Sequence, residues 1–127
     1  MDSGLDVEWA RRRDRVELTV AGEIDMATAP RLRDAIAAAR TGTGIRSVRV
    51  DLSLVDFLDS SGLAVLAEAH SACAEDGQRM EVVCANQAVR RPLRITGLDR
   101  VLTVVEPAPV GVGGSTSAAR GGAARCG

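Results

Sequence analysis

Two acids, two hydroxyls and a glycine stand close together in the middle of the chain, where their types and spacing could support chemistry. Asp56, Asp59, Ser60, Ser61 and Gly62 follow an extended apolar segment and lead into a helical pattern. Such a serine could be a catalytic nucleophile. Short hydroxyl and carboxylate side chains also accept hydrogen bonds from the free N–H groups of a first helical turn, so helix capping alone would account for them.

The sequence offers no base for a catalytic serine. A serine hydrolase needs a base within hydrogen-bond reach, and the one histidine is His70. At about 1.5 Å per residue, His70 would lie roughly 15 Å from Ser60 along a helix. The segment is also not a Gly-x-Ser-x-Gly elbow, because Leu58 stands in place of the first glycine. We therefore assign no catalytic residue and expect a protein that is not an enzyme.

Composition excludes several other classes of function. The formal net charge is -1, with 16 basic and 17 acidic residues, so no global field favours nucleic acid or an anionic membrane. The three cysteines lack a CxxC spacing, and we expect no metal site and no disulfide framework. Acidic residues at the start of the chain interrupt the basic-then-apolar pattern of a signal peptide, which is therefore not expected. No apolar run approaches the ~20 residues of a membrane span. We expect a soluble cytoplasmic protein with Cys73 and Cys84 as buried thiols.

The elements that must position the central residues follow from hydrophobic periodicity. Val48, Val50 and Leu52 alternate with polar residues, which predicts a strand. After Gly62 the period becomes helical, and a helix is expected from about Ser61 to Glu75. Its buried face is predicted to hold Leu63, Leu66, Ala67, His70 and Ala74, and its exposed face Ala64, Glu68, Ser71 and Glu75.

The first part of the chain predicts a hairpin. Leu5, Val7 and Trp9 alternate with acids, and a second alternation follows in Val16, Leu18 and Val20. The turn between them, residues 11–14, carries three arginines, which could bind phosphate or simply be solvated. With Trp9 and Phe57 as the only aromatic residues, the core is expected to be aliphatic.

The remaining segments complete an α/β pattern. Thr28 and Pro30 predict the start of a helix, residues 79–85 predict a buried strand, Asn86 can cap a last helix interrupted by Pro92, and residues 101–105 predict a short strand. The helices are expected to turn inward Leu32, Ala35, Ile36 and Ala39 in the first case, and Val89, Leu93 and Ile95 in the last. The order β-β-α-β-α-β-α-β implies a mixed, mostly parallel sheet of about five strands.

Composition divides the chain into one domain and a tail. Residues 1–106 carry the periodic segments, whereas residues 107–127 are rich in Gly, Ala and Ser and are expected to be disordered.

Four segments together resemble a known family. They are Gly22-Glu23-Ile24-Asp25, the run from Asp51 to Leu63 with Asp59-Ser60-Ser61-Gly62, Ala88-Val89-Arg90-Arg91 and Thr96-Gly97-Leu98, and they are similar to the STAS domains of bacterial anti-sigma factor antagonists. The resemblance covers residues 5 to about 106, and Asp-Ser-Ser-Gly is its most specific part. It implies a STAS-type fold.

The resemblance also implies a function. Such an antagonist binds an anti-sigma factor that is a serine kinase, and it thereby frees a sigma factor. The first serine after the aspartate is the phosphate acceptor, which places phosphorylation on Ser60, with Ser61 as the second choice. Asp25, Asp59, Ser60, Ser61 and Gly62 would bind the partner. No cofactor is expected, since ATP and magnesium belong to the kinase, and a serine phosphatase would reverse the modification.

The same fold could serve another assembly. A STAS domain can be an accessory subunit of a lipid-transport complex or part of a stress-sensing complex, and it would then dock constitutively. The Asp59-Ser60-Ser61 segment favours the regulated form.

Overall fold

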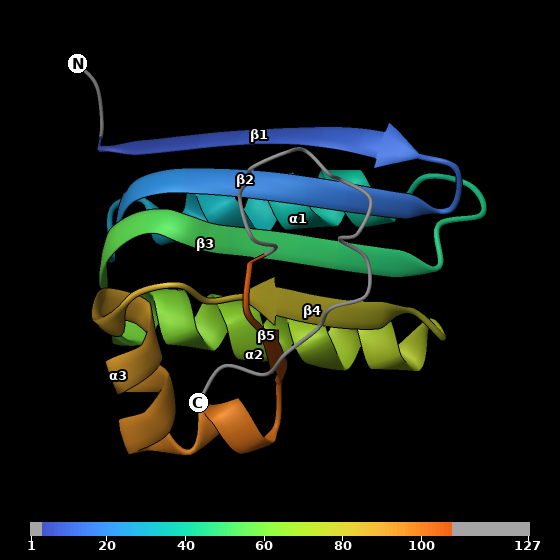
Figure 1. Cartoon of the computed structure of the whole chain (residues 1–127). Coiled ribbons are helices and arrows are strands. Elements are labelled where there is room, and N and C mark those ends of the chain that lie inside the picture. Colours follow the sequence, from blue (N-terminus) through green and yellow to red (C-terminus); the bar gives the residue numbers. More distant parts are fainter. Residues whose placement is uncertain (1–3, 108–127) are drawn as a thin grey trace, which may run out of the picture.

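The computed structural model describes residues 4–107 and shows a five-stranded sheet with three α-helices and one short 3-10 helix in this part of the chain (Figure 1). In chain order the elements are β1 (Leu5–Arg12), β2 (Arg15–Ile24), α1 (Ala29–Arg40), β3 (Ser47–Leu58), α2 (Ser60–Glu75), β4 (Arg79–Val83), α3 (Gln87–Thr96), η1 (Leu98–Arg100) and β5 (Thr103–Val105). The α/β class and the predicted order are confirmed. Apart from Pro107, the expected disordered tail lies outside the described residues.

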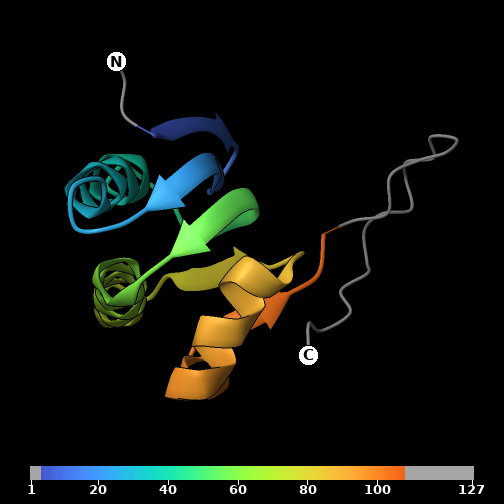
Figure 2. The ribbon, with the colours of Figure 1, turned by 90° about the vertical axis from the view of Figure 1, so that its left-hand side faces the viewer.

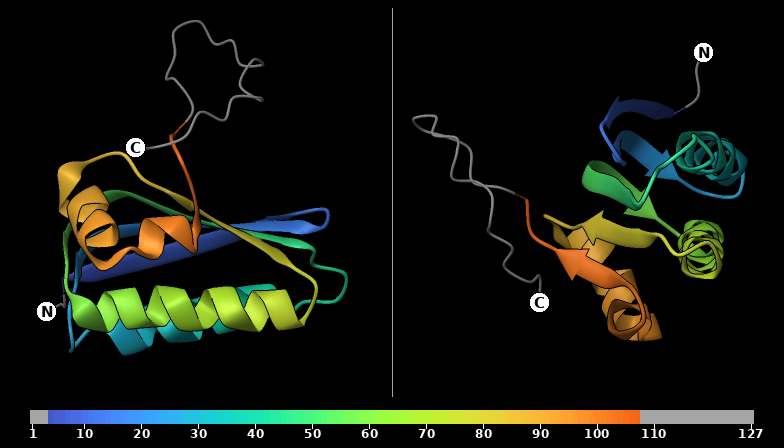
Figure 3. Two further views of the ribbon diagram at one scale, coloured as in Figure 1. Left: turned by 90° about the horizontal axis from the view of Figure 1, so that it is seen from below. Right: turned by 90° about the vertical axis from the view of Figure 1, so that its right-hand side faces the viewer.

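The strands follow the chain order β1-β2-β3-β4-β5 across the sheet. The β1–β2 hairpin is antiparallel, and every later pair is parallel. Helical crossovers explain the parallel pairs. Each crossover returns the chain to the end of the sheet at which the previous strand began, so that the next strand runs in the same direction. Figure 2 shows α1 and α2 side by side on one face, while α3 and η1 lie towards β4 and β5. The view from below gives the same arrangement (Figure 3).

The core between the sheet and the two long helices is aliphatic, as predicted. Leu18, Val50, Leu32 and Leu66 are fully buried, whereas both aromatic side chains are about half exposed. Cys73 and Cys84 are buried free thiols, and burial raises the pKa of Cys73 against the lowering effect of the nearby Arg40 guanidinium. This raised pKa keeps the Cys73 thiol protonated and unreactive.

The predicted buried face of α2 is partly wrong. Ala74 is exposed, His70 and Ala67 are half-buried, and the helix instead buries Gly62, Leu63, Val65, Leu66, Ala69 and Cys73. Small and apolar residues occur on more than one side of this helix, so periodicity alone did not fix its rotation. The predicted exposed face, including Glu68 and Ser71, is confirmed.

Three further expectations are corrected at element ends. Ile95 is 75% exposed, because Val89 and Leu93 already fill the inner face of α3. The predicted strands 79–85 and 101–105 are shorter, at Arg79–Val83 and Thr103–Val105. Asn86 caps α3 as predicted, and the helix runs through Pro92.

Thr28 stands at the N-cap position of α1, but its hydroxyl does not cap the helix. It donates to the carbonyl oxygen of Glu23 at 2.8 Å and accepts from the N–H of Asp25 at 2.9 Å. The Thr28 hydroxyl therefore stabilises the loop between β2 and α1 and does not cap the first turn of the helix.

Two irregularities in the β2–β3 pairing shape the end of the sheet that carries the candidate site. The register shifts between Thr19 and Ala21 and again between Gly22 and Glu23, so β3 gains a residue at each place. Gly22 has φ +110, and a Cβ there would collide with the carbonyl oxygen of Gly4. Only glycine fits this backbone, which explains why the Gly-Glu-Ile-Asp segment of β2 begins with glycine beside the second bulge of β3.

Candidate functional site

The candidate site lies where β2 and β3 end. Ile24 pairs with Leu58 as the last pair of the two strands, and the N–H of Asp59 donates to the carbonyl oxygen of Ile24 at 3.1 Å. The loop that begins at Asp25 and the start of α2 are therefore neighbours, at the left end of the sheet in Figure 1. The structure thus brings together Asp25 and the predicted residues 59–62, although they are far apart in the chain.

Asp59 is the N-cap of α2. Its backbone is extended, and its carboxylate oxygen Oδ1 accepts from the N–H of Ser61 at 2.8 Å and of Gly62 at 3.4 Å. These are two of the N–H groups that a first helical turn leaves without intrahelical partners. Asp59 is thus the capping residue. The sequence alone could not assign this role among Asp59, Ser60 and Ser61.

Ser60 is consequently left free for chemistry. It is the first residue of α2 and is exposed, whereas Ser61 is half-buried. Within residues 4–107 the Ser60 hydroxyl makes no hydrogen bond. Its Oγ therefore lies at the surface beside the positive end of the helix dipole, where a negatively charged group is stabilised.

Gly62 has a packing role in this turn. A Cβ at this position would lie 2.6 Å from Cγ2 of Ile24 and would also collide with Cδ1 of Leu58. Glycine therefore allows the first turn of α2 to rest directly on the last pair of the sheet. Gly62 is buried, and its predicted contact with a partner stays a prediction.

Asp25 shapes the neighbouring loop. Its Oδ1 accepts from the N–H groups of Ala27 at 2.9 Å and Thr28 at 3.0 Å, so the carboxylate is half-buried in its own turn. Met26 projects from this loop and is 77% exposed. The loop that neighbours the start of α2 thus presents an apolar side chain to solvent.

Sequence reasoning missed an exposed apolar pair on β3. Leu54 is 63% exposed and Phe57 46% exposed, and each lies beside one of the register shifts. The bulges turn both side chains away from the core that Val55 and Leu58 enter. Adjacent apolar residues at 54–55 and 57–58 break the strand alternation, and that break was the available signal.

Asn86 also belongs to the support of this region. Its Nδ2 donates to the carbonyl oxygens of Ser53 at 3.2 Å and Val55 at 3.0 Å, while its Oδ1 accepts from the N–H of Val89. One side chain therefore fixes the bulged segment of β3 and caps α3. The sequence predicted only the second of these roles.

The site is acidic. The segments 23–28 and 56–62 contain Glu23, Asp25, Asp56 and Asp59 and no basic residue. Among the described residues no group of His, Cys, Asp or Glu is arranged to hold a metal ion. In the same part of the chain, no helix is both long and apolar enough to cross a membrane. The features of the site are therefore a free hydroxyl, several acidic side chains and exposed apolar side chains.

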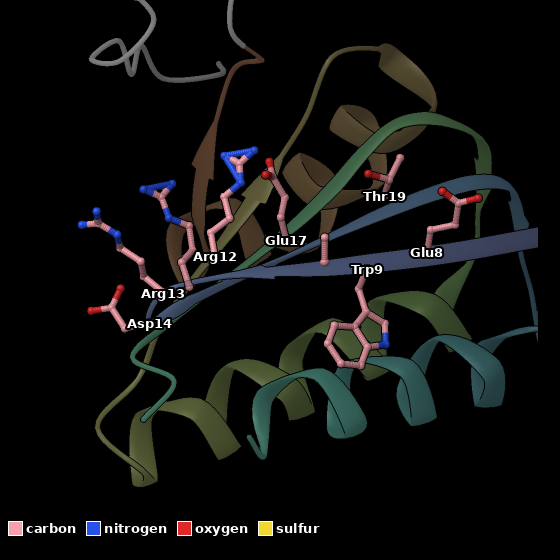
Figure 4. Close-up of a pocket in the computed structure, with 9 residues that line it drawn as sticks. Glu8, Trp9, Arg12, Arg13, Asp14, Glu17 and Thr19 are labelled. Atoms are coloured by element: carbon pink, nitrogen blue, oxygen red, sulfur yellow. The ribbon is translucent and has the colours of Figure 1, made fainter. Parts of the chain in front are cut away.

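The arginine turn of the hairpin lies at the other end of β2. Arg11 donates to the carbonyl oxygens of Thr43 at 2.8 Å and Arg13 at 2.7 Å, so its guanidinium is used within the fold. An open hollow there is lined by Arg12 and Arg13 but also by the acids Glu8, Asp14 and Glu17 (Figure 4). These acids oppose phosphate binding and favour the interpretation of a solvated turn.

Comparison with known proteins places these features in a family. The family model described as Mlab, STAS domain matches residues 7–106. The anti-sigma-F factor antagonist RsfB of Mycobacterium tuberculosis is 37% identical over 100 residues, which cover 76% of this chain and 80% of that protein. The anti-sigma-B factor antagonist of Listeria monocytogenes is 31% identical over 94 residues, covering 74% of this chain and 82% of that protein.

A solved structure agrees with the described fold. The crystal structure of an anti-sigma factor antagonist from Mycobacterium paratuberculosis aligns with a TM-score of 0.72 at 34% identity. The alignment covers 81% of this chain and 86% of that chain. The five-stranded sheet and its helices are therefore those of a STAS domain.

Proposed function

The chain belongs to the STAS domain family, and we propose that it works as an anti-sigma factor antagonist whose binding is switched off by a phosphate on Ser60. The named relatives support the first half of this proposal. The observation that carries the second half is the free, exposed hydroxyl of Ser60 at the start of α2, with Asp59 already serving as the cap.

The position of Ser60 suits a phosphate acceptor. An exposed residue at the tip of a helix can enter the active site of a kinase. The Ser60 oxygen would attack the γ-phosphorus of ATP, the bond from that phosphorus to ADP would break, and the hydroxyl proton would leave. The new group carries about 1.5 to 2 negative charges, which the first turn of a helix tolerates. The fold should therefore survive the modification.

The docking surface that we propose for the anti-sigma factor combines this serine with exposed apolar side chains from the neighbouring loop and from β3. We call the exposed side chains of Met26, Leu54, Phe57 and Ser60 the switch surface. Large apolar side chains of this kind can be the buried anchors of a protein interface. Unmodified Ser60 adds little bulk among them, so the partner can seat directly on the surface.

Phosphate on Ser60 would act on the complex and not on the fold. It brings bulk and a dianion that must lose water in the interface, next to the carboxylates of Asp56 and Asp59. A hundredfold loss of affinity needs only ~2.7 kcal/mol, within the range of one misplaced charge. The kinase that binds ATP and magnesium is the anti-sigma factor itself, a serine phosphatase reverses the modification, and the exchange takes place in the cytoplasm.

The decisive experiment combines phosphate mapping with binding. Purified chain is incubated with the cognate anti-sigma kinase, ATP and magnesium, and the product is analysed by mass spectrometry. We expect one phosphate on Ser60, no modification of Ser60→Ala, and full modification of the neighbouring control Ser61→Ala. By calorimetry, the unmodified chain and Ser60→Ala should bind the kinase, and the phosphorylated chain should bind at least about 100-fold more weakly.

Two results would contradict the switch. Phosphate found on Ser61 or on a threonine would move the acceptor. A chain that no serine kinase modifies, and whose Ser60→Asp variant still binds its partner unchanged, would instead be a constitutive STAS subunit of another assembly.

A further inference from the structure

The first strand of the sheet has a free edge. Within residues 4–107, β1 pairs with β2 alone, and it does so over eight residues without a register shift. Figure 1 shows it as the outermost strand. Proteins usually protect such edges with bulges, prolines, very short strands or charged side chains, because an edge presents unpaired N–H and C=O groups. β1 has neither a bulge nor a proline, and its charged side chains are of both signs, so its edge can accept a strand whose charges are complementary.

The hairpin register shows which backbone groups lie at this edge. Arg12 pairs with Arg15 across the two-residue turn Arg13-Asp14, with Arg13 at φ 58. In a hairpin of this type the pair beside the turn exchanges both hydrogen bonds, and the pattern alternates along the strand. Even-numbered residues of β1 therefore bond to β2. The odd-numbered residues, Val7, Trp9 and Arg11 among them, direct their N–H and C=O groups outward.

The charges along β1 are ordered by sign. Its first half carries Asp6 and Glu8, and its second half carries Arg11 and Arg12. In an antiparallel pair the first half of one strand lies opposite the second half of the other. A strand with this order is therefore complementary to a second copy of itself, because each acidic half meets a basic half.

We propose that two copies of this chain associate through their β1 strands, antiparallel and two-fold symmetric, with Trp9 opposite Trp9 and Asp6 opposite Arg12 of the other copy. This register places outward-directed odd residues opposite one another, as an antiparallel ladder requires. It also pairs Asp6 with Arg12 twice, once on each side of the axis. The product is a continuous ten-stranded sheet.

The exposure of Trp9 supports a second copy of the chain as the partner of β1. Trp9 is 46% exposed, and Figure 4 shows it on the side of β1 that faces α1, while Glu8 and Arg12 project from the opposite face. Tryptophan is enriched at the energetically important positions of interfaces. In the proposed pair the two indole rings meet at the symmetry axis and cover each other.

The proposed contact is separate from the switch surface. β1 lies at one edge of the sheet, whereas Ser60 follows β3 in its interior, two strands away. Pairing through β1 therefore leaves Ser60 open to a kinase. The proposal does not depend on the proposed function, and the failure of either one leaves the other standing.

The chain provides its own reporter for the test. Trp9 is the only tryptophan, and the chain has no tyrosine, so the intrinsic fluorescence comes from the proposed interface. We expect the full chain to shift from the monomer mass of 13.3 kDa to twice that mass between micromolar and millimolar concentration in sedimentation equilibrium. The emission should shift to shorter wavelength over the same range. A monomer mass with unchanged emission at every concentration would overturn the proposal.

Charge reversal tests the partner and the register together. Asp6→Arg or Arg12→Asp alone should weaken association at least about tenfold, and the double variant should restore it. Circular dichroism confirms that each variant is folded. Val7→Pro, which removes an outward N–H, should abolish pairing, with Val7→Ala as its control. Association unaffected by both single charge reversals would overturn the proposal, and rescue only by Glu8→Arg with Arg12→Glu would overturn the Trp9-centred register.

Discussion

At the scale of single residues, the start of α2 separates a structural task from a chemical one. Asp59 satisfies the N–H groups of the first turn, and Gly62 lets that turn rest on Ile24 and Leu58. Ser60 takes part in neither contact. The Ser60 side chain is exposed, its hydroxyl makes no hydrogen bond among the described residues, and it lies at the positive end of a helix. It can therefore gain a phosphate without the loss of a side-chain hydrogen bond.

The capping role of Asp59 predicts a graded loss of stability. Asp59→Ala removes the acceptor for two N–H groups and should lower the free energy of unfolding by about 1 kcal/mol. Asp59→Asn keeps an acceptor oxygen and should lose less than half as much. Asp56→Ala is the matched control, an exposed carboxylate three residues earlier, with an expected change within about 0.5 kcal/mol. Urea unfolding measures all three, and equal losses for Asp56→Ala and Asp59→Ala would contradict the capping role.

At the scale of elements, the two bulges decide what the end of β3 presents to solvent. Strict alternation would send successive side chains to opposite faces, but an added residue at each bulge reverses that order. Leu54 and Phe57 therefore leave the core although both are apolar. The carbonyl groups displaced at this point are held by the side chain of Asn86.

This double role of Asn86 can be tested by two substitutions. Asn86→Ala loses the bonds to Ser53 and Val55 and the cap of α3, and it should lower the free energy of unfolding by about 2 to 3 kcal/mol. Asn86→Ser can still cap the helix but is too short to reach β3, so it should recover about 1 kcal/mol of that loss. Gln87→Ala, at the exposed first position of the helix, is the control. Chemical denaturation gives the values, and full recovery by serine would mean that the bonds to β3 contribute nothing.

The same elements show what could be predicted from the sequence. Period-2 and period-3.6 patterns identified each strand and each α-helix, because burial of one face imposes these periods, whereas the short 3-10 helix Leu98–Arg100 was not predicted. The rotation of α2 was not accessible, since small and apolar residues occur on several sides of this helix and only packing selects one. The exposure of Ile95 was accessible, because Ile95 lies two residues after Leu93 and therefore off the face that Val89 and Leu93 share. The candidate site residues at 59–62 were selected from one local segment, and their functional role stays a prediction. The apolar part of the switch surface was missed because the bulges arise from long-range pairing between β2 and β3.

At the scale of the whole molecule, stability and recognition lie in different places. The aliphatic core fills the space between the sheet and α1 and α2, whereas the residues of the proposed switch surface are exposed, on the loop after β2, on the second half of β3 and at the start of α2. Charge added at that end meets solvent and helix N–H groups, not the core. A modification there can change which partner is bound while the free energy of unfolding stays nearly constant.

Ser60→Asp tests this separation directly. The variant should weaken binding of the anti-sigma factor by up to about 100-fold, or ~2.7 kcal/mol, because a carboxylate must lose water in the interface. Its free energy of unfolding should change by less than ~1 kcal/mol, since Ser60 is exposed and its hydroxyl makes no hydrogen bond among the described residues. Ser71→Asp adds the same charge on the exposed face of the same helix and should leave binding unchanged. Thermal unfolding and calorimetry on the three proteins give both quantities, and a large stability loss in Ser60→Asp alone would show that the serine is mainly structural.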